Sequence, residues 1–446
     1  MGAVNEELFE RMPVPKAVKK LMVPTIAGSL VMVLYSLADT LFVGMLNDEL
    51  QSAAVALAAP ALMAFNAVNN LFGIGTSSMM SRALGAKDSD TVRKSAAFGF
   101  YGSVFSGLLM AVLAYLFLNP LMRVLGATED TLAATRAYMN WAVVLGAVPS
   151  ILNVVMGYLI RSEGAAFHAS IGTMSGCFLN MILDPIFILP WGLNLGAAGA
   201  GAATFVSNCV ACLYFLILLK VKKQNTNIRL NFKYFTLEKR IFEGICGVGV
   251  PAAIQNILNV TGMAVLNNFV KDYGPAAVAA VGIAQKINMV PLQIALGGTQ
   301  GVMPLISYSY AGKNKGRMKE CILYVVKLML PCMTAVSLTC WLFAGPLVQM
   351  FIQSSDVVAY GILFLRGFCV ALPFMLMDFL AVGVFQGVGK GKNSLVFAIL
   401  RKIILEIPAI ILLNSLFHAA GITYAGFVAE VVLSVAGVIL LRKIII

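Results

Sequence analysis

The second half of the sequence repeats the first at an offset of 225 to 227 residues, and this repeat limits the fold more than any other feature. The repeated positions are Pro24 and Pro251, Gly85 and Gly312, Pro120 and Pro346, Asp130 and Asp356, Gly164 and Gly389, Gly196 and Gly421, and Gly201 and Gly426. Of the 446 residues, 60% are hydrophobic and only 12% are charged. A soluble chain of this length could not stay dispersed with so few charges. The sequence therefore predicts a duplicated helical bundle in a membrane, which is the usual architecture of secondary transporters.

The apolar stretches predict twelve transmembrane helices, six in each copy. They cover 21–46, 53–80, 95–118, 135–160, 165–190, 196–219, 243–270, 275–305, 320–345, 357–386, 392–417 and 420–441. A helix needs roughly 20 such residues to cross a bilayer. We therefore expect an all-α membrane protein built from two pseudo-symmetric six-helix bundles. The N-terminal lobe is expected at 1–220, a basic cytoplasmic linker at 221–240 and the C-terminal lobe at 241–446.

Lysine and arginine residues gather on one side of the predicted membrane. They are Arg11, Lys16, Lys19 and Lys20 before the first span; Arg82, Lys87, Arg93 and Lys94 between spans 2 and 3; Lys220, Lys222, Lys223, Arg229, Lys233, Lys239 and Arg240 in the linker; Lys313, Lys315, Arg317 and Lys319 between spans 8 and 9; and Lys390, Lys392, Arg401 and Lys402 in the region of spans 10 and 11. Cytoplasmic loops of membrane proteins carry an excess of lysine and arginine. We therefore expect a multi-pass protein of a bacterial cell membrane with both termini in the cytoplasm. Because six is an even number, both lobes should point the same way.

The formal net charge of +12 is accounted for by these loops, which would face anionic membrane lipid. A nucleic-acid partner is not expected, because the basic loops lack interleaved aromatic residues. The eight cysteines mostly lie inside spans, and the two histidines lack metal-ligand spacing, so no cofactor is predicted. No obligate protein partner is evident either.

The segment 387–394 resembles a phosphate-binding loop but does not have its spacing. A P-loop needs four residues between its first glycine and a Gly-Lys pair that Ser or Thr follows, and here Asn393 follows Gly391-Lys392. Without a nucleotide site, transport by this chain would have to be driven by an ion gradient.

Two carboxylates of the first half lie inside predicted spans, Asp39 in span 1 and Asp184 in span 5. Ionisable groups in the membrane are costly and mark functional sites by default. Asn180 lies one helical turn before Asp184 and shares its face. Pro185 donates no backbone hydrogen bond, which leaves the carbonyl of Met181 free. This combination of oxygens suits a hard cation, such as sodium, or a proton.

Tyr138 in span 4 and Thr204 in span 6 are expected at the same depth as the two aspartates. At about 1.5 Å per residue, all four groups fall in one layer of the outer half of the membrane. The alternative is that each polar group is separately satisfied by a wet helix end or an interhelical hydrogen bond. The second copy has Leu266, Phe364, Leu405 and Ala429 at roughly the matching positions, so the polar set is specific to the first half.

The second half carries a different polar set, which we assign to substrate binding. It comprises Gln255, Asn256 and Asn259 in span 7, Lys286 in span 8 and Asp378 in span 10. Glu406 and Glu430 lie nearer the ends of spans 11 and 12 and are not part of this set. Asp378 faces either a substrate cavity or Lys286. The 23 methionines suggest an adaptable lining, although packing explains most of them.

Several motifs resemble the multidrug and toxic compound extrusion (MATE) family over nearly the whole chain. They are the first-span segment 37–44 (Leu-Ala-Asp-Thr-Leu-Phe-Val-Gly), the segment 180–185 (Asn-Met-Ile-Leu-Asp-Pro), the segment 196–204 from Gly196 to Thr204, and the turns Arg161-Ser-Glu-Gly164 and Gln386-Gly-Val-Gly389. Pro24 resembles a proline associated with bending of the first span in some members.

The resemblance implies two lobes that open alternately and drug efflux coupled to sodium or proton entry. It also implies that Asp39, Tyr138, Asn180, Asp184 and Thr204 form the cation or proton network of the first lobe. Some members carry a glutamate where this chain has Gln255, which leaves Asp378 as the main candidate for a second-lobe cation role.

We therefore expect a secondary active exporter of small-molecule drugs, mostly lipophilic cations. A lipid-linked oligosaccharide flippase of the same superfamily is the alternative, but it would need several deep basic residues, and only Lys286 is obviously deep. An intramembrane enzyme would need a nucleophile or base at a loop mouth, and none is visible, so no catalytic residue is assigned.

The first prediction concerns orientation. In a cysteine-free background, a cysteine replacing Asp48 should react with a membrane-impermeant maleimide in intact cells, and one replacing Arg229 should not, because the positive-inside rule puts residue 229 in the cytoplasm. Labelling at position 229 but not at position 48 would reverse the topology.

Overall fold

The computed structural model of the chain describes residues 6–445, and this part is helical with short connecting turns and no β-strand. The predicted all-α class is confirmed. The chain divides into two compact units. Unit 1 comprises Met1–Arg11 and Leu30–Ala253, and unit 2 comprises Met12–Ser29 and Ile254–Ile446. The predicted lobe limits at residues 1 and 446 lie outside the described residues.

Nine of the described helices are long and apolar enough to cross a membrane. A tenth span forms if Glu129–Leu145 and Ala147–Ser162 are counted together across their 45° bend. The last two predicted spans, 392–417 and 420–441, fall on a helical stretch that runs from Gly391 to Ile445. Its one non-helical backbone position is His418, so the predicted break between these spans is a kink. Every predicted span thus coincides with helix.

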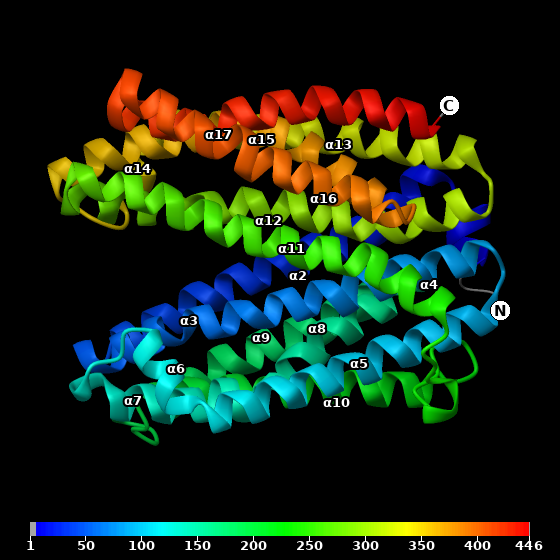
Figure 1. Ribbon diagram of the computed structural model, residues 1–446, viewed down its shortest axis with the longest axis horizontal. Helices are drawn as coiled ribbons and strands as arrows, with labels where there is room; N and C mark the ends of the chain where they lie inside the picture. The colour runs from blue at the N-terminus through cyan, green and yellow to red at the C-terminus, as the bar shows by residue number, and fades with distance from the viewer. Residues whose placement is uncertain (1–5, 446) are drawn as a thin grey trace. The chain divides into compact units, whose positions relative to one another are not determined.

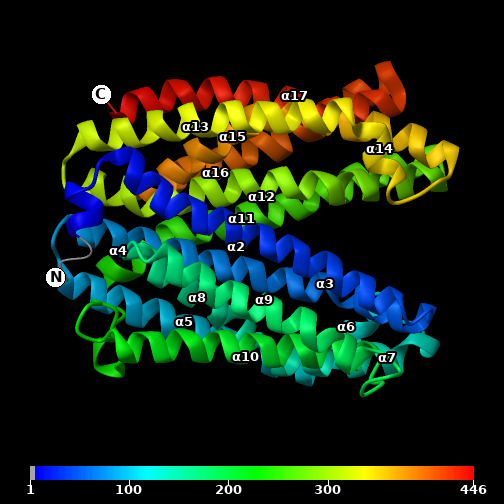
Figure 2. The same ribbon diagram turned by 180° about the vertical axis from the view of Figure 1, so that it is seen from behind.

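Unit 1 is a bundle in which α10 packs against α7, α8 and α9, while α5 packs against α8 (Figures 1 and 2). Its helices are η1 (Glu7–Arg11), the second half of α2 (Val14–Gly44), α3 (Glu49–Asn69), η2 (Asn70–Ile74), α4 (Gly75–Gly85), α5 (Ser89–Leu116), α6 (Leu118–Val124), α7 (Glu129–Met139), η3 (Asn140–Leu145), α8 (Ala147–Ser162), α9 (Ala166–Ile188), α10 (Ala197–Val221), η4 (Phe232–Tyr234) and the first part of α11 (Lys239–Val270).

Unit 2 is organised around α15, which packs against α12, α13 and α17 and is the most buried of the spans. Its helices are the first part of α2, the rest of α11, η5 (Lys271–Tyr273), α12 (Pro275–Ala311), α13 (Lys315–Leu342), α14 (Ala344–Gln349), α15 (Ser355–Gly387), α16 (Gly391–Ile399), η6 (Leu400–Glu406) and α17 (Ile407–Ile445). Gln386 near the end of α15 donates to the side chains of Gln255 (3.3 Å) and Ser394 (3.1 Å).

Backbone conformations in the two units show where the sequence repeat was misaligned. Lys87 and Lys313 both have a φ of 59°, so Ala86, and not the predicted Gly85, corresponds to Gly312. Gly196 (φ 56°, ψ −133°) corresponds in the same way to His418 (φ 54°, ψ −139°).

The segment Ala197-Ala-Gly199 therefore matches Ala419-Ala-Gly421, and the predicted pairing of Gly196 with Gly421 is wrong. The turn between α9 and α10 is three residues longer than the kink at His418, which shifts the register. The counterpart of Thr204 is then Gly426 and not Ala429, but it still offers no side-chain ligand. His418 holds a conformation that suits glycine, at a cost of about 1–3 kcal/mol.

The basic linker is folded onto unit 1. Glu163, directly after α8, is buried and accepts hydrogen bonds from the hydroxyl of Thr226 and from the backbone N–H of Asn227 (2.7 Å). The hydroxyl of Tyr101 on α5 donates to the carbonyl of Leu230 (2.7 Å). Burial raises the pKa of the Glu163 carboxyl, and these hydrogen bonds oppose that rise by stabilising its charged form.

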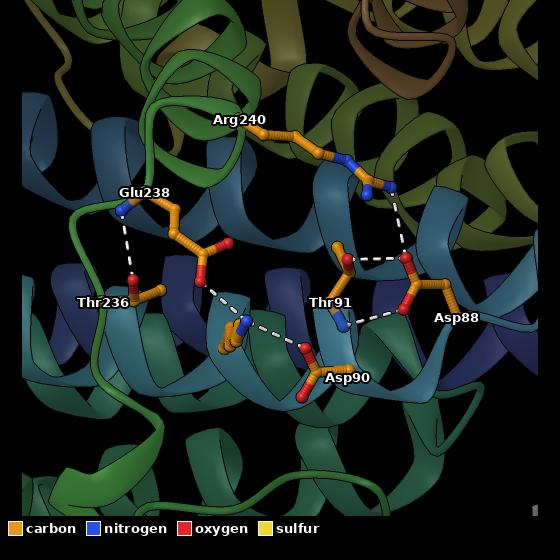
Figure 3. A network of polar contacts seen from close by, with 7 residues as sticks. Asp88, Asp90, Thr91, Thr236, Glu238 and Arg240 are labelled. Carbon is orange, nitrogen blue, oxygen red and sulfur yellow. Dashed lines mark hydrogen bonds and ion pairs between the residues drawn. The ribbon is translucent and has the colours of Figure 1, made fainter.

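A second set of polar contacts holds the end of the linker, as Figure 3 shows. Arg240 pairs with Asp88 (3.1 Å), and Glu238 pairs with Lys94 on α5 (2.7 Å). Asp88 is the N-cap of α5 and accepts from the hydroxyl (2.7 Å) and the backbone N–H (3.0 Å) of Thr91. These hydrogen bonds, with the nearby Arg240 guanidinium, hold the pKa of Asp88 below its usual range. The linker is thus attached at both ends.

The second prediction concerns this attachment. Replacing Glu163 by Ala should weaken linker docking by about 2 kcal/mol, because the loss of one charge-assisted hydrogen bond costs ~1.5–3 kcal/mol and water can replace the second at the freed linker groups. Limited trypsin digestion of the purified protein should then cut after Arg229 on the order of 30 times faster, since cleavage follows the population of the open form.

Two variants control for this experiment. Glu163→Gln keeps one acceptor oxygen and should fall between wild type and Glu163→Ala. Glu129→Ala removes an exposed carboxylate at the start of α7 and should leave digestion unchanged. Unchanged cleavage in Glu163→Ala would show that the carboxylate does not hold the linker.

Candidate cation site

The polar groups predicted for the first lobe come together in unit 1. Asn180 and Asp184 lie one turn apart on α9, and both are buried. The Asn180 amide satisfies its neighbours only when its nitrogen faces Asp184, donating to Oδ2 (2.8 Å) and Oδ1 (3.3 Å). Its oxygen then accepts from the backbone N–H (3.0 Å) and the hydroxyl (3.3 Å) of Thr204 on α10. One amide therefore links the carboxylate of α9 to α10.

Asp39 on α2 completes the group but is not hydrogen-bonded in the same way. Its Oδ1 is buried and has no hydrogen-bond partner among residues 6–445. The carboxylate lies close enough to Asp184 and to Tyr138 on α7 to act on them electrostatically. A buried oxygen without a donor is costly, so this position is suited to a proton or a cation.

Small residues bring these helices into contact at the site. A Cβ atom at Gly201 would lie 2.9 Å from the carbonyl oxygen of Tyr138, so only glycine allows α10 and α7 this close approach. Thr204 lies one turn after Gly201 on α10 and is thereby held next to Asn180.

Tyr35 also belongs to this group, although the sequence did not lead us to predict it. It lies one turn before Asp39 on α2, and its hydroxyl lies close enough to Thr204, Asp39, Tyr138 and Asp184 to interact with them. The signal was available, because residues four apart share a helical face. The tyrosine was overlooked because its ring is apolar enough to read as part of a membrane span.

In unit 2, Asp378 was predicted to face either a substrate cavity or Lys286. The predicted partner Lys286 is wrong, because Asp378 pairs with Arg401. Asp378 is buried on α15 and its Oδ2 lies 3.5 Å from Nη1 of Arg401 on η6. The other terminal nitrogen of Arg401 pairs with Glu430 on α17. Lys286 is exposed on α12.

Arg401 itself was counted among the basic residues of the cytoplasmic side in the region of spans 10 and 11, but its side chain is buried in unit 2. The residue is 6% exposed, and its guanidinium stacks over the ring of Phe379 at 5.1 Å. Glu430, predicted nearer the span end, is also buried. Arg401 lies inside the predicted span 392–417, but a count of basic residues does not show whether a side chain within a span faces the buried interior or the cytoplasmic side.

The remaining predicted substrate residues do not form one group with Asp378. Gln255, Asn256 and Asn259 lie half-buried on α11, where Gln255 accepts from Gln386. Within residues 6–445, no three His, Cys, Asp or Glu side chains are arranged to hold a metal ion. The oxygen set around Asp39 and Asp184 includes two carboxylates, so it suits a monovalent cation or a proton better than a tightly held metal.

Known proteins similar to this chain are membrane transporters. The family model MatE matches residues 24–186 and 251–412. Multidrug export protein MepA of Staphylococcus aureus (strain MSSA476) is 32% identical over 437 residues, covering 97% of this chain and 94% of its own length. MepA of Staphylococcus haemolyticus is 33% identical over 432 residues, with 96% and 94% covered.

Solved structures match the whole chain. One is described as the outward-facing conformation of a multidrug resistance MATE family transporter of the MOP superfamily (TM-score 0.93, 26% identity, 100% of this chain and 98% of that one). Another is a MOP superfamily transporter from Pyrococcus furiosus, whose reversed pocket polarity is described as suggesting a different function (TM-score 0.92, 26% identity, 100% and 98% covered). The family model and the sequence relatives together show that this multi-pass membrane chain belongs to the MatE family, the multidrug and toxic compound extrusion transporters.

Proposed function

We propose that the chain is a secondary active multidrug exporter that exchanges lipophilic, mostly cationic compounds for sodium or protons by alternating access. Its place would be a bacterial cell membrane, with both termini in the cytoplasm and its basic loops against anionic lipid. The relatives named multidrug export protein MepA support the export of small molecules. No catalytic role is proposed for any residue.

The observation that carries this proposal is the unpartnered oxygen of Asp39 beside Asp184. Two carboxylates in one low-dielectric site repel each other, so at least one must be neutralised by a proton or a cation. The Asn180 amide already donates to both oxygens of Asp184, which leaves Asp39 as the group that gains most from an added positive charge.

Neutralising Asp39 can change the packing of unit 1. The carboxylate sits on α2, whereas its neighbours sit on α7, α9 and α10, so its charge acts between separate helices. An ion that binds one arrangement of these helices better than another shifts the population toward it. Entry of sodium or a proton would thereby drive one half of the transport cycle.

Cationic cargo is supported by the same charges. A cargo cation and the coupling ion would compete for carboxylates, so that each can be carried only when the other has left. The substrate role predicted for Asp378 has lost support because its carboxylate lies beside Arg401, inside a buried charged cluster of unit 2.

The flippase alternative has less support. It would need deep basic residues free to bind a pyrophosphate, and the guanidinium of Arg401 is already paired with two carboxylates. The Pyrococcus transporter with reversed pocket polarity is a reason to test the cargo charge directly.

The third prediction concerns Asp39 and Asp184. Asp39→Asn and Asp184→Asn should each reduce gradient-driven uptake of a fluorescent cation into inverted vesicles to the level of empty-vector vesicles, because neither amide can take up the coupling ion. Sodium and proton gradients imposed separately identify that ion.

Expression and thermal unfolding should remain close to wild type, since asparagine keeps the shape of the side chain. Asp130→Asn, at an exposed carboxylate in the first turn of α7, is the matched control and should transport normally. Wild-type uptake by a well-expressed Asp39→Asn variant would refute the coupling role.

A further inference from the structure

Unit 2 contains a buried charged cluster that the transport proposal does not use. Three carboxylates, those of Asp378, Glu406 and Glu430, surround the two cations Arg401 and Lys402. They come from α15, η6 and α17, and all five side chains are at least mostly buried. If every group were ionised, the cluster would carry one net negative charge.

The excess charge can be traced to the groups around Arg401. Lys402 and Glu406 form a pair of their own, in which Nζ donates to both carboxylate oxygens (2.7 and 2.6 Å). That pair is neutral and complete. The remaining groups are one arginine and two carboxylates, Asp378 and Glu430, so a single positive charge faces two negative ones.

Each of these two carboxylates has one oxygen without a partner. Oδ1 of Asp378 and Oε2 of Glu430 are buried and accept no hydrogen bond from any residue that the structure describes. The charges that act on Asp378 come from Arg401 and Lys402, and those on Glu430 come from Arg401, Asp378, Glu406 and Lys402. An uncompensated charge in such an interior costs several kcal/mol, of the order of what burying one ion costs.

The contact distances distinguish the two carboxylates. Arg401 is in direct hydrogen-bonding contact with Glu430, whereas its nearest approach to Asp378 is 3.5 Å. Glu430 therefore holds the arginine as an ion pair, and Asp378 is the carboxylate with the weaker compensation. A metal ion is a poor second partner here, because the Arg401 guanidinium would repel it from both free oxygens.

We propose that Asp378 holds an exchangeable proton, which makes Asp378, Arg401 and Glu430 a proton-binding site in unit 2, separate from the Asp39 site. With the proton on Asp378, the cluster is neutral and Arg401 keeps one full ion pair. When the proton leaves, Arg401 is shared between two carboxylates on α15 and α17. Proton exchange therefore changes how strongly η6 is held to each of these helices.

The experiment is infrared difference spectroscopy of the purified full-length protein in liposomes during a titration from acid to alkaline pH. A protonated carboxylic acid has a C=O stretch that a carboxylate lacks. The measurement uses the Asp39→Asn, Asp184→Asn background, so that those carboxyls give no signal. Since it requires no transport, its failure can be told apart from failure of the proposed function.

The expected result is a protonated-carboxyl band at neutral pH that disappears as the pH rises. Incorporation of aspartate with carbon-13 in the side-chain carboxyl should shift this band. Asp378→Asn should abolish it. Glu430→Gln should abolish it too, because one arginine then faces one carboxylate and no proton is needed. Asp356→Asn, an exposed position on the same helix α15, should leave it intact.

Three outcomes overturn the proposal. The first is absence of the band at neutral pH in protein with native Asp378, and the second is its survival in Asp378→Asn. The third is a band that labelled aspartate does not shift, which would place the proton on a glutamate and not on Asp378. The labelling measurement needs no substitution in the cluster, so it decides the question even where a cluster variant does not fold.

Thermal unfolding gives an independent readout. The native cluster gains a net charge when the proton leaves, so the melting temperature of wild type should fall as the pH rises through that transition. Asp378→Asn copies the neutral side chain and should remove this fall. Equal alkaline destabilisation of both proteins would contradict a proton on Asp378.

Discussion

The cost of placing polar and charged groups in a low-dielectric interior governs this molecule at every level. A backbone in hydrocarbon must satisfy its own N–H and C=O groups, which is why residues 6–445 form helices and turns. The same cost applies to side chains. Every carboxylate buried in a span must be hydrogen-bonded, paired with a cation, or neutralised, and the two units meet this requirement in different ways.

Unit 1 neutralises its carboxylates incompletely. The Asn180 amide bonds to Asp184 and Thr204, but in the described part of the chain no basic side chain pairs with Asp39, and one of its oxygens is left without a donor. Unit 2 uses a buried arginine between Asp378 and Glu430 instead. The duplicated scaffold thus holds two chemically different ionisable clusters, one with a carboxylate oxygen that lacks a donor among the described residues and one that contains a guanidinium.

Burial also explains the linker. A strongly basic segment between two lobes would be expected to remain solvated, but Glu163 offers a buried carboxylate that its backbone and Thr226 can satisfy. Tyr101 and the ion pairs of Asp88 and Lys94 hold the rest. The connection between the lobes is therefore a packed part of unit 1, and its conformation is coupled to the ends of α5 and α8.

Local pattern in the sequence determined the helical class, the twelve spans, the repeat and the group of Asp39, Asn180, Asp184 and Thr204, because hydropathy and helical spacing are properties of neighbouring residues. The part played by Tyr35 was equally local and was missed. The partner of Asp378, the depth of Arg401 and the docking of the linker were decided only by tertiary structure. A charged side chain chooses its partner by distance in space, and Arg401 is joined to Asp378 and Glu430 from helices separated by many residues of chain. Only packing brings such groups together, so no local pattern could have named them.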